Sequence, residues 1–140
     1  EVRLSRPTED TQLGVSIATS LIARVNDANN WGADYFISLH ANASEFSNAS
    51  GQEAYVYSLN TAASNLADNL LTQLHFTTGL NTRGVFARPS LYVLRKTSMP
   101  AVLLELGFIT NSYDAELMAY SPELFAEGIT NGFLVYLGML

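Results

Sequence analysis

The 140-residue sequence contains no cysteine, which excludes disulfide bonds and thiolate metal sites. Charged residues make up only 14% of the chain, and its formal net charge is −6. Lysine and arginine form no cluster, so we expect neither a nucleic-acid ligand nor binding to an anionic membrane surface. No apolar run has the length of a membrane-spanning helix, and membrane insertion is therefore not expected.

Several common catalytic and nucleotide-binding motifs are also missing. The chain has no G-x-S-x-G nucleophile elbow, no G-x-G-x-x-G loop and no P-loop. Serine hydrolase and nucleotide-binding functions therefore lose their usual support. The metal-binding motif H-E-x-x-H is absent as well.

What the chain does contain is enough apolar sequence for one compact domain over residues 1–140. Hydrophobic residues make up 48% of the chain, and a domain of this length buries roughly two-thirds of its unfolded surface. Residue 1 is Glu rather than Met, and Val2 and Leu4 give EVRLSR the alternation of a strand. A chain that opens inside a strand is expected to be a processed or truncated polypeptide.

Predicted strands and helices alternate along the chain. Helices are predicted over 12–30, 61–78, 111–119 and from Ser121 to the last apolar residues near 137. Strands are predicted over 35–40, 52–59 and 100–106, with two short extended pieces around Pro89 in 82–95. This order predicts an α/β fold with a mainly parallel central sheet flanked by helices on both faces.

Glu105 interrupts the apolar run of the strand in MPAVLLELGFITN, residues 99–111. A buried carboxylate without a partner is costly, so Glu105 either pairs with Arg or backbone N–H groups or has a functional role. His40 ends another predicted strand, and ligands bind beyond the carboxyl ends of parallel strands. If the two strands run in the same direction, His40 and Glu105 face a common cleft. Taken alone, a strand-terminal histidine is more often a hydrogen-bonded structural residue.

Several stretches, in order along nearly the whole chain, resemble the zinc-dependent N-acetylmuramoyl-L-alanine amidases of bacterial cell-wall turnover. These stretches are LSRPTED (4–10), Arg24 with Ala28 and Asn29, GADYFISLHANAS (32–44), GQEAYVY (51–57), NTRGV (81–85) and LYVLRKTSMPAVLLELGFITN (91–111). The resemblance implies cleavage of the amide between N-acetylmuramic acid and the L-alanine of the peptidoglycan stem peptide. It also implies that the protein acts outside the cytoplasmic membrane, in the bacterial cell wall.

The resemblance assigns roles to individual residues. His40 corresponds to a zinc ligand, and Glu105 to the catalytic glutamate that takes a proton from a zinc-activated water and passes it to the leaving amine. Asn42 would lie at the rim of the cleft, where it either holds substrate or closes a turn. Arg95 is a second substrate-binding candidate, because a cation would meet a stem-peptide carboxylate; the alternative is a solvated strand end.

The metal site of this family uses three protein ligands, and two of them precede the segment that matches LSRPTED. No later residue of this chain matches those two. We therefore expect a fragment of an intact enzyme rather than a degenerate, non-catalytic domain that binds peptidoglycan or regulates a partner. A third alternative is a structural domain in which Glu105 forms an ion pair. Because an acidic chain has no electrostatic means of holding the anionic wall, we also expect a separate wall-targeting domain in the parent protein.

Overall fold

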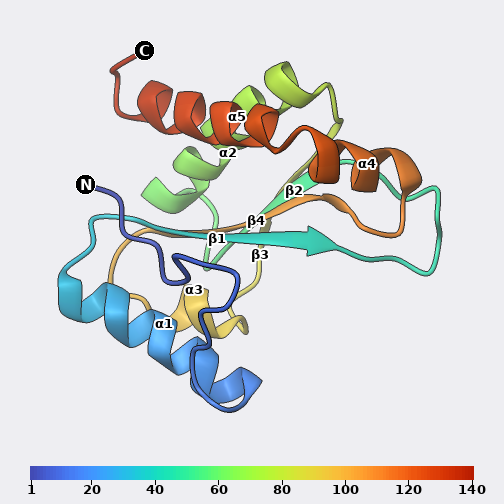
Figure 1. Cartoon of the computed structure of the whole chain (residues 1–140). Coiled ribbons are helices and arrows are strands. Elements are labelled where there is room, and N and C mark those ends of the chain that lie inside the picture. The colour runs from blue at the N-terminus through green and yellow to red at the C-terminus, as the bar shows by residue number, and fades with distance from the viewer.

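The computed structural model describes all residues 1–140 and shows one four-stranded sheet between two layers of helices (Figure 1). In chain order, the elements are α1 (Ile17–Trp31), β1 (Phe36–Asn42), β2 (Gln52–Val56), α2 (Ala62–Thr78), β3 (Thr82–Ala87), α3 (Tyr92–Lys96), β4 (Ala101–Phe108), α4 (Ser112–Tyr120) and α5 (Pro122–Tyr136). No helix is both long enough and apolar enough to cross a membrane.

The strand order in the sheet is β1-β4-β2-β3. The pairs β1–β4 and β2–β3 are parallel, whereas β2 and β4 are antiparallel. The predicted α/β fold with a mainly parallel sheet is therefore confirmed. The antiparallel pair in the centre of the sheet brings the start of β2 to the carboxyl end of β4.

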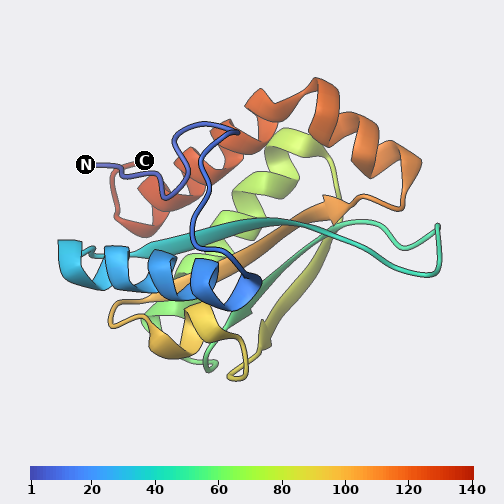
Figure 2. The ribbon, with the colours of Figure 1, turned by 60° about the horizontal axis from the view of Figure 1, so that its bottom comes forward.

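The alternation of side chains along β4 divides the core between the two faces of the sheet. Val102 and Leu104 belong to the larger apolar cluster, under α2 and α5. Ala101 and Leu103 belong to a smaller cluster with residues of α1 and α3 on the opposite face. Figure 2 shows the sheet between these two helical layers. Glu105 continues the alternation of Leu103, so its side chain points to the face that α1 and α3 cover.

The N-terminal segment is not a strand, contrary to the prediction for residues 1–6. Val2 and Leu4 are exposed, at 87% and 64%. The segment contacts α1 instead, where Arg3 forms an ion pair with Asp27 at 2.7 Å. Alternation alone did not produce a strand, because no neighbouring strand pairs with this segment.

One predicted helix boundary and one predicted element type also differ in the structure. Helix α1 begins at Ile17 rather than at residue 12, because Ser16 and Thr19 form a capping box at that point. The second extended piece predicted within 82–95 is instead part of helix α3 (Tyr92–Lys96). The adjacent side chains of Val93 and Leu94 are both buried in the same cluster, whereas a strand would point them to opposite faces.

A buried carboxylate at the start of α4 fastens the end of β4 to the loop before β2. Asp114 Oδ1 accepts a hydrogen bond from Ser50 Oγ at 2.6 Å. Its Oδ2 accepts hydrogen bonds from the backbone N–H groups of Gly51 and Phe108, both at 2.9 Å. The side chain of Asp114 thus fixes the strand end that follows Glu105.

Asp114→Ala should lower the free energy of unfolding by about 2–4 kcal/mol, because it leaves two buried N–H groups without an acceptor. Urea denaturation of the variant measures the loss. Glu116→Ala is the matched control on the exposed face of the same helix, and it should change the stability by less than about 0.5 kcal/mol. Equal losses in the two variants would contradict this role of Asp114.

Candidate active site

Three titratable side chains meet where β1, β4 and β2 lie side by side. Glu105 of β4 is in register with His40 of β1 on one side and with Glu53 of β2 on the other. Neighbouring strands lie about 4.8 Å apart, so side chains in register on one face are neighbours. The structure thus brings together His40 and Glu105, the two residues that the strand ends indicated, and adds Glu53, which was not among the predicted site residues.

Three donors surround the carboxylate of Glu53, which is only 8% exposed. Its Oε1 accepts hydrogen bonds from the Tyr55 hydroxyl at 2.5 Å and from Asn42 Nδ2 at 2.7 Å. Its Oε2 accepts a hydrogen bond from Arg83 Nε at 3.1 Å. Burial, together with the hydrogen bond to Glu53, raises the pKa of Tyr55 to about 12, so the hydroxyl keeps its proton and remains a donor.

Glu105 has very different surroundings. Its Oε2 is buried and has no hydrogen-bond partner. Burial, and in second place the charge of Glu53, raise the pKa of Glu105 to about 7. The ion pair that would have given Glu105 a purely structural role is absent, because Arg83 pairs with Glu53. A carboxylate with a free oxygen and a pKa near neutrality is suited to take up and return a proton.

Replacement of Glu105 by Gln should change the stability of the metal-free protein in a pH-dependent way. The folded pKa of about 7 lies above the ordinary glutamate value of 4.5, so the stability gained from protonation is fully present below pH 4.5 and is lost as the pH rises through 7. In EDTA, Glu105→Gln should therefore melt at a higher temperature than the wild type at pH 8, and at nearly the same temperature at pH 4.5. The exposed control Glu116→Gln should show no such change; an equal difference at both pH values for Glu105→Gln would contradict the raised pKa.

His40 lies near the end of β1, at the free edge of the sheet. Its Nε2 is 2.7 Å from Ser38 Oγ, which orients the ring. Desolvation of the ring, and then the guanidinium of Arg24, lower the pKa of His40 from 6.5. Both effects favour the neutral form of His40, which is the form of histidine that binds metal ions.

Residues 1–140 do not by themselves form a complete metal site. No three His, Cys, Asp or Glu side chains are grouped so that they could hold a metal ion. Catalytic zinc requires three protein ligands, and of the predicted set this chain provides only His40. Residues 1–140 thus provide one ligand that fits a zinc site but not a complete set of ligands.

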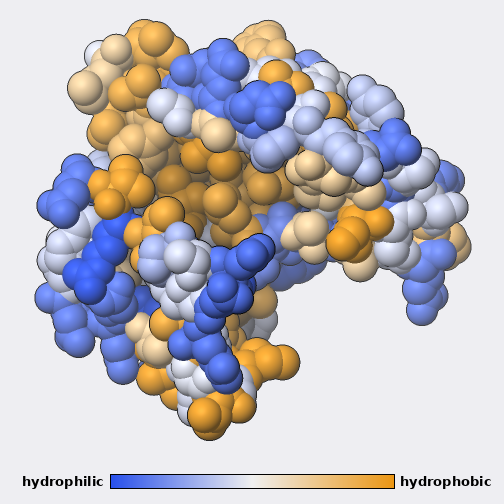
Figure 3. All heavy atoms as spheres, in the orientation of Figure 1, coloured by the Kyte–Doolittle hydropathy of each residue, from blue (hydrophilic) through white to orange (hydrophobic).

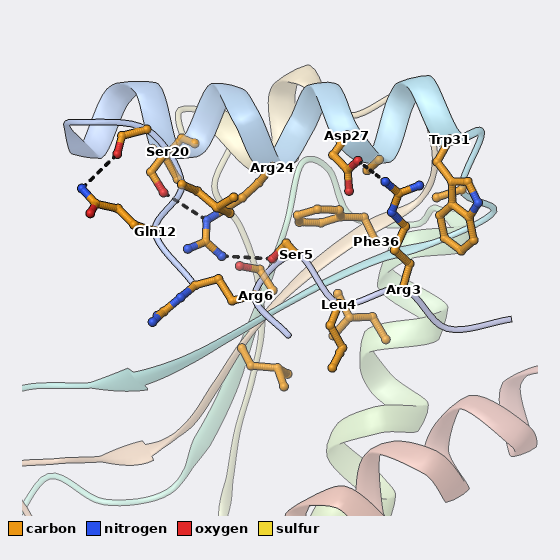
Figure 4. Close-up of a pocket in the computed structure, with 18 of the residues that line it drawn as sticks. Arg3, Leu4, Ser5, Arg6, Gln12, Ser20, Arg24, Asp27, Trp31 and Phe36 are labelled. Atoms are coloured by element: carbon orange, nitrogen blue, oxygen red, sulfur yellow. Dashed lines mark hydrogen bonds and ion pairs between the residues drawn. The ribbon is translucent and has the colours of Figure 1, made fainter. Parts of the chain in front are cut away.

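A cavity of about 890 Å³ extends from the N-terminal segment and α1 along β1 to His40. Figure 3 shows apolar side chains gathered in a hollow over β1. Arg24 reaches from α1 toward Ser5 in the close-up (Figure 4) and donates only to serine hydroxyls, while Arg6 donates only to backbone carbonyl oxygens. The cavity next to His40 therefore contains two arginines without a carboxylate partner, in a chain that is acidic overall.

The two predicted substrate-binding residues lie in different places. Asn42 belongs to the cluster around Glu105, but both ends of its amide are engaged, Nδ2 with Glu53 and Oδ1 with the N–H of Ala43. Arg95 lines a smaller cavity with Pro100 and Ala101, at the amino end of β4. The structure therefore does not bring Arg95 close to Glu105.

Two further residues of the cluster, Tyr55 and Arg83, were missed by sequence reasoning. Glu53 had a usable signal, because it places a carboxylate in a short apolar strand, as Glu105 does. Arg83 had no such signal, since it lies among polar residues in NTRGV. Its place in the site depends on the pairing of β3 with β2.

Comparison with known proteins gives a consistent family assignment. The sequence model of the family described as N-acetylmuramoyl-L-alanine amidase matches residues 1–134. The N-acetylmuramoyl-L-alanine amidase CwlM of Bacillus licheniformis is 36% identical over 134 residues, which is 94% of this chain and 49% of CwlM. The chain thus spans about half the length of this curated relative.

Solved structures have the same fold. The catalytic domain of CwlV, an N-acetylmuramoyl-L-alanine amidase from Bacillus (Paenibacillus) polymyxa var. colistinus, superposes with a TM-score of 0.74 at 34% identity, covering 86% of this chain and 66% of that one. The amidase AmiC2 of Nostoc punctiforme superposes with a TM-score of 0.79 at 30% identity, covering 94% and 71%.

Proposed function

The chain belongs to the N-acetylmuramoyl-L-alanine amidase family, and we propose that it provides the general base of a peptidoglycan hydrolase. The bond cleaved is the amide between the lactyl group of N-acetylmuramic acid and the L-alanine of the stem peptide. The observation that supports this proposal best is the state of Glu105, with a buried, unpartnered Oε2 and a pKa of about 7 next to His40.

Glu105 acts in two steps of the proposed hydrolysis. Its ionised carboxylate first takes a proton from a water molecule, and the water oxygen bonds to the carbonyl carbon of the substrate amide. The carbon–nitrogen bond then breaks, and Glu105 returns the proton to the leaving amino group of L-alanine. The products are a carboxylate on the muramic acid side and a free amine on the peptide. The buried environment keeps the pKa of Glu105 near neutrality for both transfers.

Zinc is the cofactor that we propose for the natural protein, with His40 as one of its ligands. When bound, zinc polarises a carbonyl group and lowers the pKa of a coordinated water. Because no three-ligand group exists within residues 1–140, the remaining protein ligands must be supplied by residues outside them. Among the residues of this chain, the lowered pKa of His40 and its orientation by Ser38 support the assignment.

The substrate determines where the protein acts. Peptidoglycan lies outside the cytoplasmic membrane, so we propose the bacterial cell wall as the location. With a net charge of −6, these residues have no general electrostatic attraction to an anionic wall. A separate wall-targeting domain in the natural protein would supply that attachment.

Glu105→Gln in the natural full-length protein should lower kcat for release of L-alanine amino termini from purified peptidoglycan by about 1,000-fold, because the proton acceptor is lost. Mass spectrometry of the products identifies the bond that is cleaved. EDTA should abolish the wild-type activity and added zinc should restore it, while the exposed control Glu116→Gln should remain active. If Glu105→Gln kept the activity of the wild type, the proposed role of Glu105 as general base would be refuted. If the wild type bound peptidoglycan but released no L-alanine amino termini, the non-catalytic, peptidoglycan-binding alternative would be favoured.

A further inference from the structure

Glu53, the neighbour of Glu105 on β2, holds three polar donors. They come from three different strands: Asn42 from β1, Tyr55 from β2 and Arg83 from β3. Glu105, which lies opposite Glu53 on the β2–β4 pair, receives no hydrogen bond at Oε2. Of two neighbouring carboxylates, one therefore has three donors, while the other has a buried oxygen with none.

Arg83 is the only positively charged donor of the three, and its side chain extends toward β4. Its guanidinium carbon is 5.0 Å from the centre of the Phe108 ring, so the side chain crosses β2 and reaches β4. The register of β1 and β4 slips between His40 and Asn42, and Asn42 pairs with Phe108. Such a bulge places Phe108 on the same face as Glu105. The guanidinium thus lies beside the strand that provides the base.

The other two donors are fixed independently of Glu53. The amide of Asn42 is oriented by its Oδ1, which accepts the N–H of Ala43 at 2.8 Å. The Tyr55 ring lies under the guanidinium of Arg88, 5.2 Å from its centre. The side chain of Arg83 is 43% exposed; the ion pair with Glu53 anchors its Nε, and its Nη1 donates to the carbonyl oxygen of Ser50 at 3.3 Å.

We propose that Glu53 is a positioning residue that keeps Glu105 free to act as the base, because it binds the Arg83 guanidinium that would otherwise pair with Glu105. A carboxylate with a charge-assisted hydrogen bond from arginine holds its negative charge more strongly and is a weaker base. The buried, unpartnered Oε2 of Glu105 is thus a consequence of the contacts that Glu53 makes. This inference rests on the proposed role of Glu105 in hydrolysis.

The test is the rescue of one variant by a second substitution in the natural full-length protein. Glu53→Ala should lower kcat about 100-fold with little change in KM, because Arg83 then pairs with Glu105. Glu53→Ala combined with Arg83→Met should have a kcat at least about tenfold higher than that of Glu53→Ala alone, because the competing cation is gone. If Glu53 were only structural, the double variant would be no more active than Glu53→Ala, and the proposal would be overturned.

Arg88 offers a matched control for the rescue. It is also an arginine near Tyr55, but it does not contact Glu53 through any hydrogen bond or ion pair. Glu53→Ala combined with Arg88→Met should therefore stay as inactive as Glu53→Ala alone. Equal recovery with Arg83→Met and Arg88→Met would mean that removal of any positive charge suffices, and would contradict a specific partner exchange.

A crystal structure of Glu53→Ala gives a readout that does not depend on activity. A nitrogen of Arg83 should lie within hydrogen-bonding distance of Glu105 Oε2; an Arg83 side chain directed to solvent, with Oε2 still unpartnered, would overturn the inference. If Glu53→Ala does not fold, Glu53→Leu replaces it, since a leucine side chain has no oxygen to accept the hydrogen bond from Arg83 Nε. If the wild type released no L-alanine amino termini from peptidoglycan, the proposed function would be refuted. If the wild type were active but Arg83→Met did not rescue Glu53→Ala, only the proposed role of Glu53 would be refuted.

Discussion

The antiparallel pairing of β2 with β4 sets Glu53 directly opposite Glu105, and the proposed chemistry depends on the unequal surroundings of these two carboxylates. Two like charges on neighbouring strands repel each other, so one of them favours the protonated form near neutral pH. Three donors stabilise Glu53, while Glu105 Oε2 has none. The pKa of Glu105 is accordingly the one that is raised, to about 7, and our proposal assigns the proton transfer to this member of the pair.

The mixed sheet is what makes this arrangement possible. The parallel pair β1–β4 brings His40 and Glu105 to the same end of the sheet, as strands that run in one direction do. The antiparallel β2 then places its first residues at that end as well, and β3 brings Arg83. Asp114 fixes the strand end just beyond Glu105, so the position of Glu105 does not depend on a flexible loop.

The sequence was most informative where a polar residue interrupts an apolar strand. Glu105 and His40 were identified in this way, because burial of a charge and the end of a strand are both local properties. The role of Glu53 could not be predicted, since it depends on the direction in which β2 pairs, and alternation in a sequence does not give direction. Arg95 is close to β4 in sequence but lies at its amino end, so only the three-dimensional fold separates it from Glu105.

The same limit explains the errors in the elements. EVRLSR has the alternation of a strand, but a strand also needs a neighbour to pair with, and residues 1–6 have none in this structure. The piece around residues 92–96 has β-branched and aromatic residues, yet it is helical, because both Val93 and Leu94 are buried on one side. The first segment lacks a pairing partner, and in the second, tertiary packing overrode the local pattern.

The most direct test of the unequal carboxylates is an NMR titration of the glutamate side-chain carboxyl carbons in the metal-free natural protein. The signal that disappears in Glu105→Gln identifies Glu105. Its titration midpoint should lie at about pH 7. A midpoint near 4.5, the ordinary value for a glutamate, would show that Glu105 is an ordinary solvated carboxylate and would contradict its proposed role as the base.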